Sequence, residues 1–405
     1  MKTNVFTSVP IFICLLTVAA QAQDWPQWRG PNRDAKATGF EAPKTWPHEL
    51  TQKWRTTVGS ADATPALVGD KLYVFSRIGD DEVLQCLDAA SGKEIWSDKY
   101  GSGPATGPAG AHPGPRSSPT VAEGKVVTLG VKGTLSCLDA ATGKVIWRKN
   151  DYKGWPQFYT SMSPLIINGL CIADLGGKTN GTIVAYDLAT GDEKWKWTGD
   201  APAYDSPVIL NIGDTKLVVM ETEKKIIALD PSTGAVAWQT AFAPKGMGQN
   251  CETPIVDGDT LIYTGANRGT MAVKLQKQGD SVTSQELWTN PENSPQFATP
   301  ILKNGLIFGL ASSGNFYCID AKTGKTDWTE SDAKRGGFGS IVDAGDVLLA
   351  LTPKSQLIAF EPSDKGFSEL ASIKVADKET YGYPVVSGKR VFIQDRESVT
   401  LWTLE

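Results

Sequence analysis

This 405-residue sequence is poor in the residues that build metal and catalytic centres. It has two histidines, His48 and His112, and no two cysteines at the spacing of a zinc site. A Gly-Lys-Thr tripeptide occurs at residues 177–179 and 324–326, but neither has the upstream glycine of a phosphate-binding loop. The Gly-x-Ser-x-Gly elbow and the Asp-x-Asp-x-Asp-Gly calcium loop are also missing. The sequence therefore predicts no metal site and no familiar catalytic motif.

Strong charge and long apolar runs are scarce too. The net charge of -5 offers no basic surface, so we expect no nucleic-acid partner. One apolar stretch, residues 5–19, follows Lys2 and precedes Ala20-Gln21-Ala22, which is the pattern of a secretory signal peptide spanning residues 1–22. Cys14 lies inside that stretch rather than at the cleavage point, so no lipid anchor is expected. No second run could span a membrane. We expect a soluble monomer that is periplasmic or secreted.

The chain repeats one phrase five times: an Asp, a Thr-Gly or Ser-Gly turn, and a Trp eight residues after the Asp. The copies are 43 to 51 residues apart, and the last interval is 90, about twice that spacing. A period of this length is typical of a modular array. The five pairs are Asp88 with Trp96, Asp139 with Trp147, Asp187 with Trp195, Asp230 with Trp238, and Asp320 with Trp328.

The unit at residues 118–149 reads as four short strands, here called A to D, separated by turns that contain glycine. Helical periodicity is absent from every long stretch. In the repeated phrase, the Asp is expected to cap the C–D turn and the Trp to wedge between neighbouring units. We therefore assign the Asp and Trp residues a structural role.

A second repeated feature is the proline that opens strand A. It occurs in seven units, and Gly339-Ser340 takes the remaining place, which gives eight units. The eighth unit ends at Glu405 with three strands. Residues 50–58, with Trp54, are expected to supply the fourth. The prediction is an all-β, eight-bladed β-propeller over residues 50–405, closed by pairing of its N- and C-terminal strands.

Residues 23–49 are expected to form a leader segment packed on the propeller. Trp25, Trp28 and Trp46 would staple it along the propeller wall, although a peptide-docking role for these aromatic residues stays open.

These features resemble a known family. The Asp-x-x-Thr-Gly-Lys-x-x-Trp phrase is similar to the tryptophan-docking repeat of quinoprotein alcohol dehydrogenases and of PQQ-like propeller proteins, the group that includes BamB-type assembly lipoproteins. Residues 24–39 and 114–121 also resemble stretches of exported members. The vicinal cysteine pair of the dehydrogenases has no counterpart here, and their Glu, Asn and Asp set for Ca²⁺ and base catalysis finds no matching motif. The resemblance implies the propeller fold and leaves the role open.

The variable D–A connections are expected to share one face with the B–C turns, at the mouth of the central channel. Arg116, Asp205 and Glu252 each lie within two residues of the start of a strand A. They form either a site for a small polar ligand or cation, or a set of ion pairs that seals the channel. His112 is expected to be an exposed loop residue. Further binding candidates on these connections are Asn250, Trp155, Tyr159 and Arg335.

Trp155 and Tyr159 belong to an aromatic cluster that is either a platform for a sugar or peptide or the packing of a long loop. The function that we expect is a non-catalytic, exported propeller that binds an envelope protein or a small polar ligand. The alternatives are a PQQ-dependent dehydrogenase that uses PQQ with Ca²⁺, and a carbohydrate-binding module. For the leading interpretation we expect no cofactor and no catalytic residue.

Overall fold

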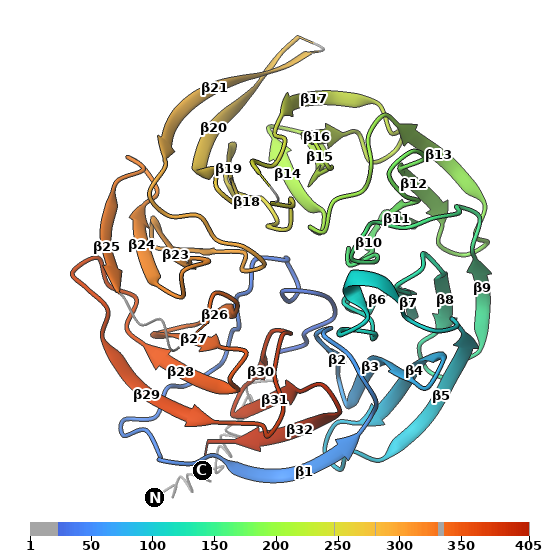
Figure 1. Cartoon of the computed structure of the whole chain (residues 1–405), viewed down its shortest axis with the longest axis vertical. Helices are drawn as coiled ribbons and strands as arrows, with labels where there is room; N and C mark the ends of the chain where they lie inside the picture. Colours follow the sequence, from blue (N-terminus) through green and yellow to red (C-terminus); the bar gives the residue numbers. More distant parts are fainter. Residues whose placement is uncertain (1–22, 247, 280, 331–335, 405) are drawn as a thin grey trace, which may run out of the picture.

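The structure is a closed ring of eight four-stranded antiparallel sheets (Figure 1). It is a computed structural model that describes residues 23–246, 248–279, 281–330 and 336–404. The predicted signal peptide and Arg335 lie outside the described residues. Among those that are described, no helix has the length and apolarity to cross a membrane.

Each blade runs from an inner strand A to an outer strand D. Blades 1 to 4 comprise β2 (Ala66–Val68), β3 (Lys71–Ile78), β4 (Asp81–Asp88), β5 (Glu94–Gly101); β6 (Thr120–Ala122), β7 (Lys125–Leu129), β8 (Leu135–Asp139), β9 (Val145–Lys149); β10 (Leu165–Ile167), β11 (Leu170–Leu175), β12 (Thr182–Asp187), β13 (Glu193–Thr198); and β14 (Val208–Ile212), β15 (Thr215–Glu221), β16 (Lys225–Leu229), β17 (Val236–Ala241).

Blades 5 to 8 comprise β18 (Ile255–Asp257), β19 (Thr260–Gly265), β20 (Gly269–Gln278), β21 (Ser281–Asn290); β22 (Ile301–Lys303), β23 (Leu306–Leu310), β24 (Phe316–Asp320), β25 (Thr326–Glu330); β26 (Ser340–Ala344), β27 (Val347–Leu351), β28 (Gln356–Phe360), β29 (Glu369–Lys374); and β30 (Val385–Ser387), β31 (Arg390–Gln394), β32 (Ser398–Thr403), β1 (Thr51–Thr57). The 3₁₀ helix η1 (Gly107–Ala109) lies in the connection between β5 and β6.

The ring closes as the sequence predicted. Strand β1 pairs antiparallel with β32, with Thr51 opposite Thr403 and Trp54 opposite Leu401. The first strand of the propeller is therefore the outermost strand of the blade that holds the C-terminus. This pairing covers an edge that would otherwise expose unpaired backbone groups.

The repeated phrase builds the contact between neighbouring blades. Asp139 Oδ1 accepts hydrogen bonds from the backbone N–H and the hydroxyl of Thr142, at 2.8 and 2.7 Å. The N–H of Gly143 donates to the Asp139 carbonyl. Gly143 has φ of 72°, and a Cβ there would lie 2.5 Å from the Trp96 ring of the preceding blade. Each such glycine lets a tryptophan lie flat on the next C–D turn.

The tryptophan also makes a hydrogen bond across the same contact. Trp147 is 6% exposed, and its Nε1 donates to the carbonyl of Leu188 in the next blade at 3.0 Å. Within its own sheet it pairs with Cys137, at a β-bulge between strands C and D. A small residue, Cys or Ala, pairs with the tryptophan in the other repeats as well.

The leader segment takes a different path from the one we expected. Trp25 pairs with Leu67 of the innermost strand β2 and is fully buried, and Ala37 donates to Asp343 of β26 on another side of the ring. Arg33 is 3% exposed and donates to the Pro207 carbonyl at 3.0 Å. Figure 1 shows this part of the chain, in blue, crossing the centre of the ring. The wall position predicted for Trp25 was wrong, because carbonyls that open the inner strands hold the segment inside the channel.

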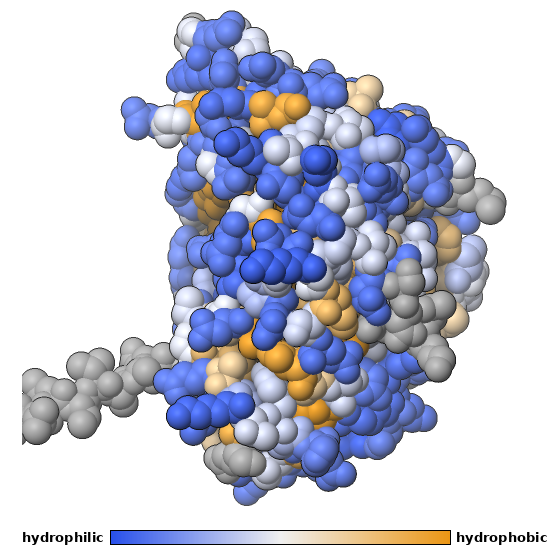
Figure 2. Space-filling model, turned by 90° about the vertical axis from the view of Figure 1, so that its left-hand side faces the viewer, coloured by the Kyte–Doolittle hydropathy of each residue, from blue (hydrophilic) through white to orange (hydrophobic). Residues whose placement is uncertain are grey.

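One side of the outer wall is seen in Figure 2. The side seen in Figure 2 is mostly hydrophilic, with smaller apolar patches between charged side chains. Such scattered exposure is ordinary for a soluble surface. The D–A connections at the channel mouth differ from this surface because they line a cavity.

Candidate functional site

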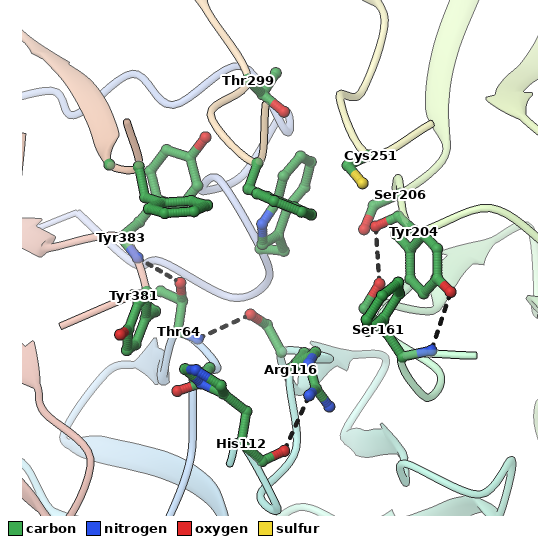
Figure 3. A pocket seen from close by; sticks show the side chains of 18 of the residues that line it. Thr64, His112, Arg116, Ser161, Tyr204, Ser206, Cys251, Thr299, Tyr381 and Tyr383 are labelled. Atoms are coloured by element: carbon green, nitrogen blue, oxygen red, sulfur yellow. Dashed lines mark hydrogen bonds and ion pairs between the residues drawn. The ribbon is translucent and has the colours of Figure 1, made fainter. Parts of the chain in front are cut away.

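A cavity of about 450 Å³ opens at the channel mouth, on the face where the D–A connections reach the inner strands. Its walls come from segments just ahead of strand A in blades all around the ring (Figure 3). This volume lies in the range of small-ligand pockets. Aromatic side chains make up much of the lining: Trp28, Phe158, Tyr204, Phe297, Phe338, Tyr381 and Tyr383.

The residues before the strand-A prolines are linked by hydrogen bonds that run from blade to blade around most of this cavity. The backbone N–H of Ser118 donates to the Ser163 hydroxyl at 2.9 Å, and Ser163 donates in the same way to Ser206. The N–H of Tyr383 donates to the Thr64 hydroxyl at 2.8 Å, which links the last blade to the first. The full set of hydroxyl acceptors is Thr64, Ser118, Ser163, Ser206, Thr253 and Thr299.

Sequence reasoning used the prolines at these positions and missed the hydroxyls. The available signal was the recurrence of Ser or Thr directly before proline in six of the seven units that have one. These hydrogen bonds link neighbouring blades at the channel mouth, since each hydroxyl satisfies a backbone donor of the adjacent blade.

Arg116 lies in the cavity wall, as the sequence placed it. Its Nη2 donates to the His112 carbonyl at 2.9 Å, and its guanidinium lies 5.8 Å from the Tyr159 ring centroid. Nη1 is buried and has no hydrogen-bond partner among the described residues. Burial lowers the pKa of Arg116 from its usual value. The cavity wall therefore carries a desolvated cation with unused donor capacity.

His112 lies in a loop, as the sequence predicted, and its side chain keeps part of its exposure. The His112 side chain is 34% exposed and lines the cavity. Its Nδ1 lies 2.8 Å from Asp62 Oδ2, and its ring meets the Tyr381 ring edge-on at 5.0 Å. The imidazole thus ties the long connection before β6 to blades 1 and 8.

Asp205 and Glu252 lie behind the cavity wall rather than in it, at 2% and 0% exposure. Asp205 Oδ2 accepts from the N–H of Glu221 at 2.8 Å, and Glu252 Oε1 accepts from the N–H of Phe297 at 2.9 Å. Burial raises the pKa of each carboxyl to about 8. Among the described residues neither carboxyl forms an ion pair with Arg116. The predicted set of ion pairs that would seal the channel is therefore not formed by these three residues.

Two buried acids near this site escaped the sequence analysis. Glu221 ends β15, and both of its carboxylate oxygens are buried without a partner among the described residues. Burial, with Asp205 and Glu252 nearby, raises the pKa of Glu221 well above its usual value. Asp174 in β11 is 3% exposed, and its pKa is raised by burial and by Asp205. A single acid within an apolar strand was the only signal for either residue.

Of the remaining predicted binding residues, Asn250 and Tyr159 are buried, whereas Trp155 is exposed. Asn250 is 2% exposed and donates to the carbonyls of Thr222 and Phe242, which fastens its loop. Tyr159 is buried as well, and its hydroxyl donates to the Thr106 carbonyl at 2.9 Å. Trp155 is 42% exposed. The aromatic cluster therefore serves loop packing at Tyr159 and leaves a free surface at Trp155.

An exposed aromatic pair stands at the rim of the cavity. Phe297 and Phe338 stack with ring centroids 5.2 Å apart, and they are 49% and 41% exposed. Phe297 has φ of 61°, a region that bulky residues rarely adopt. Its N–H hydrogen bond to the buried Glu252 helps to hold it there.

The cavity does not offer the ligand set of a calcium-bound quinone. Asp62 is the one described carboxylate among the lining residues, and it already contacts His112. Asp205 Oδ2 and both oxygens of Glu252 accept from backbone N–H groups, and Asp205 Oδ1 is buried. Within the described ranges, no group of three His, Cys, Asp or Glu residues is placed to hold a metal ion.

Comparison with known proteins settles the family. The model of a protein family, PQQ_2, described as outer membrane protein assembly factor BamB, matches residues 44–196 and 80–330. The chain belongs to this family. The BamB of Burkholderia pseudomallei (strain K96243) is 24% identical over 356 residues, which cover 85% of each chain. A quinohemoprotein alcohol dehydrogenase of Comamonas testosteroni is 31% identical over 140 residues, 34% of this chain and 19% of that protein.

Solved structures from both branches share the fold of this BamB-family chain. The crystal structure of BamB from Moraxella catarrhalis has a TM-score of 0.65 at 18% identity, over 87% of this chain and 99% of that one. The quinohemoprotein alcohol dehydrogenase structure from Comamonas testosteroni has a TM-score of 0.71 at 15% identity, over 96% and 81%. At these identities the likeness shows the propeller and leaves the role to the site.

Proposed function

We propose that this BamB-family propeller is a non-catalytic scaffold of the cell envelope that binds a protein partner through its channel-mouth face. The leader sequence favours export, and relatives across most of the chain carry the name of an outer-membrane assembly factor. The exposed Phe297–Phe338 pair carries the proposal, because exposed aromatic residues beside a cavity are typical of protein interaction sites.

A photocrosslinking experiment tests this assignment. A photoreactive phenylalanine analogue replaces Phe338 on the mouth face in one variant and Ile146 on the outer wall in another. These two side chains are 41% and 40% exposed, so they are matched in accessibility. In the organism that encodes the chain, we expect the Phe338 variant to form one dominant adduct with an envelope protein. Equal adducts from both positions, or none from Phe338, would contradict the proposal.

The dehydrogenase alternative has its own test. The partial likeness to a quinohemoprotein alcohol dehydrogenase favours it, whereas the carboxylates turned away from the cavity oppose it. Purified protein is incubated with PQQ and Ca²⁺, and absorbance and dye-linked alcohol oxidation are measured. We expect neither cofactor retention nor turnover.

A further inference from the structure

We propose that the channel-mouth cavity receives an aromatic side chain of the partner polypeptide together with an adjacent carboxylate, and that Arg116 binds this carboxylate. The inference rests on the proposed function and specifies the chemistry of the partner segment. It joins three properties of the mouth: an unpaired cation in the wall, an aromatic lining, and the exposed Phe297–Phe338 pair at the rim.

The unpaired cation selects an anionic partner. Arg116 Nη1 is buried without an acceptor among the described residues, and removing a charged donor from water without replacing its hydrogen bonds costs free energy. The acids around it are committed elsewhere: Asp62 to His112, and both Asp205 and Glu252 to backbone N–H groups. The charge of Asp62 acts on Arg116 from a distance, but no described acid forms an ion pair with it, so a carboxylate from outside would meet an arginine with an unused donor. Arginine binds carboxylates with strong, geometrically specific hydrogen bonds.

The lining selects an aromatic neighbour for that carboxylate. Phe158 and Tyr204 have ring centroids 6.2 Å apart on the side of blades 3 and 4, and Trp28 stands edge-on to Tyr383 at 5.8 Å. Aromatic rings prefer such edge and offset contacts with a further ring. The volume of about 450 Å³ leaves room for an aromatic side chain and part of its backbone.

The rim favours a polypeptide over a free small molecule. Phe297 and Phe338 precede strand A of blades 6 and 7 and line the cavity. Trp155 precedes strand A of blade 3 and lines a separate, smaller pocket. A small ligand within the cavity would leave Trp155 in water. A chain that crosses the mouth would cover Trp155 together with the Phe297–Phe338 pair, as aromatic anchors do in protein interfaces.

The aromatic pair at the rim is also fixed in position by a hydrogen bond from the backbone of Phe297. The buried Glu252 accepts the N–H of Phe297, which keeps this residue at a positive φ with its ring stacked on Phe338. Local backbone strain of this kind concentrates at ligand-binding positions. Glu252 is therefore a positioning residue, which acts through Phe297 and does not contact the partner.

The first experiment uses the unmodified protein, so it does not depend on any variant folding. A library of random displayed peptides is selected against it, and a selected peptide is synthesised with each acidic residue either kept or changed to the corresponding amide. We expect enrichment of Asp or Glu next to Phe, Tyr or Trp, and at least about tenfold weaker binding of the amide peptide. Selection without acidic enrichment, or equal binding of both peptides, would overturn the proposal.

The second experiment assigns the carboxylate to Arg116. Arg116→Gln should weaken the acidic peptide about tenfold and leave the amide peptide unchanged, while Arg116→Lys restores part of the affinity. Arg390→Gln is the matched control, since Arg390 also lies over an aromatic ring with its pKa lowered by burial, in the A–B hairpin on the opposite face. Equal loss of affinity in the Arg116→Gln and Arg390→Gln variants would show a general charge effect and refute the assignment.

A third measurement separates the two possible sources of the ligand. If 3-phenylpropionate binds as tightly as the peptide and Phe338→Ser weakens neither, the cavity takes a free aromatic acid and the polypeptide proposal is wrong. If Phe338 crosslinks to a partner and Arg116→Gln leaves the adduct yield unchanged, this inference fails while the proposed function stands. If the peptide chemistry holds without any crosslinked partner, the proposed function fails instead.

Discussion

The contact between Trp147 and Gly191 offers the sharpest test of how the blades hold together. Gly191 has φ of 77°, and a Cβ on it would lie 2.7 Å from Trp147 Cγ. An alanine there is strained by about 1–2 kcal/mol from its left-handed backbone alone, and the clash adds to this. Gly213 is the matched control, since it has φ of 55° and no atom within 4 Å of its Cβ position. Gly191→Ala should therefore destabilise the protein by clearly more than Gly213→Ala.

Removing the Trp147 side chain should give the largest loss of stability among these variants. Trp147 is 6% exposed, so Trp147→Ala should lower the free energy of unfolding by about 3–5 kcal/mol, the usual range for a buried aromatic truncation. Trp147→Phe keeps most of the packing and removes the donor to Leu188, which should cost about 1 kcal/mol. Urea unfolding followed by circular dichroism measures each variant.

A double-mutant cycle isolates the contact. Once Trp147→Ala has removed the ring, Gly191→Ala should cost clearly less than it does with the ring present. The backbone strain stays, and of the three close contacts only the Cβ of residue 147, at 3.1 Å, remains. The reasoning is refuted if Gly191→Ala costs the same with the ring and without it. The contact of Trp147 with the next C–D turn would then contribute nothing specific to the stability of the propeller.

Three further outcomes are expected. Because burial raises the pKa of Asp205 and Glu252 to about 8, the folded state keeps protons that the unfolded chain releases above about pH 4. The free energy of unfolding should then fall by more than about 1.4 kcal/mol as the pH rises from about 4 to about 8. The fall should be smaller in the Asp205→Asn variant. A free energy of unfolding that does not change over this pH range would argue against buried neutral carboxyls. Deleting residues 50–58 removes Trp54 and exposes the edge of β32, so the melting temperature should drop sharply. An unchanged melting temperature would argue against closure of the propeller by β1. Mass spectrometry of exported protein should find an unmodified N-terminus near Gln23, whereas a retained leader or an acylated cysteine would contradict the signal-peptide prediction.

Much of the fold could be predicted because its determinants are local. Asp139, Gly143 and Trp147 lie within one hairpin, and each acts on its own turn or on the adjacent blade. Repetition of such short units reveals the number of blades and the three-stranded last blade that needs β1. The same argument put Arg116 at the channel mouth, since residues just ahead of strand A share one face.

The tertiary structure alone decided the path of the leader and the partners of the buried acids. Arg33 meets Pro207 across 174 residues of sequence, and no local pattern indicates that a segment ahead of the first blade enters the channel. Asp205 and Glu252 lie two residues before the strand-A proline of their blades and turn to backbone N–H groups. Arg116 lies three residues before its proline, as do Tyr204 and Cys251, which also line the cavity. The sequence by itself determined the ring, because local turns and nearest-neighbour contacts build it. The mouth depends on hydrogen bonds between distant segments, and only the closed ring brings those together.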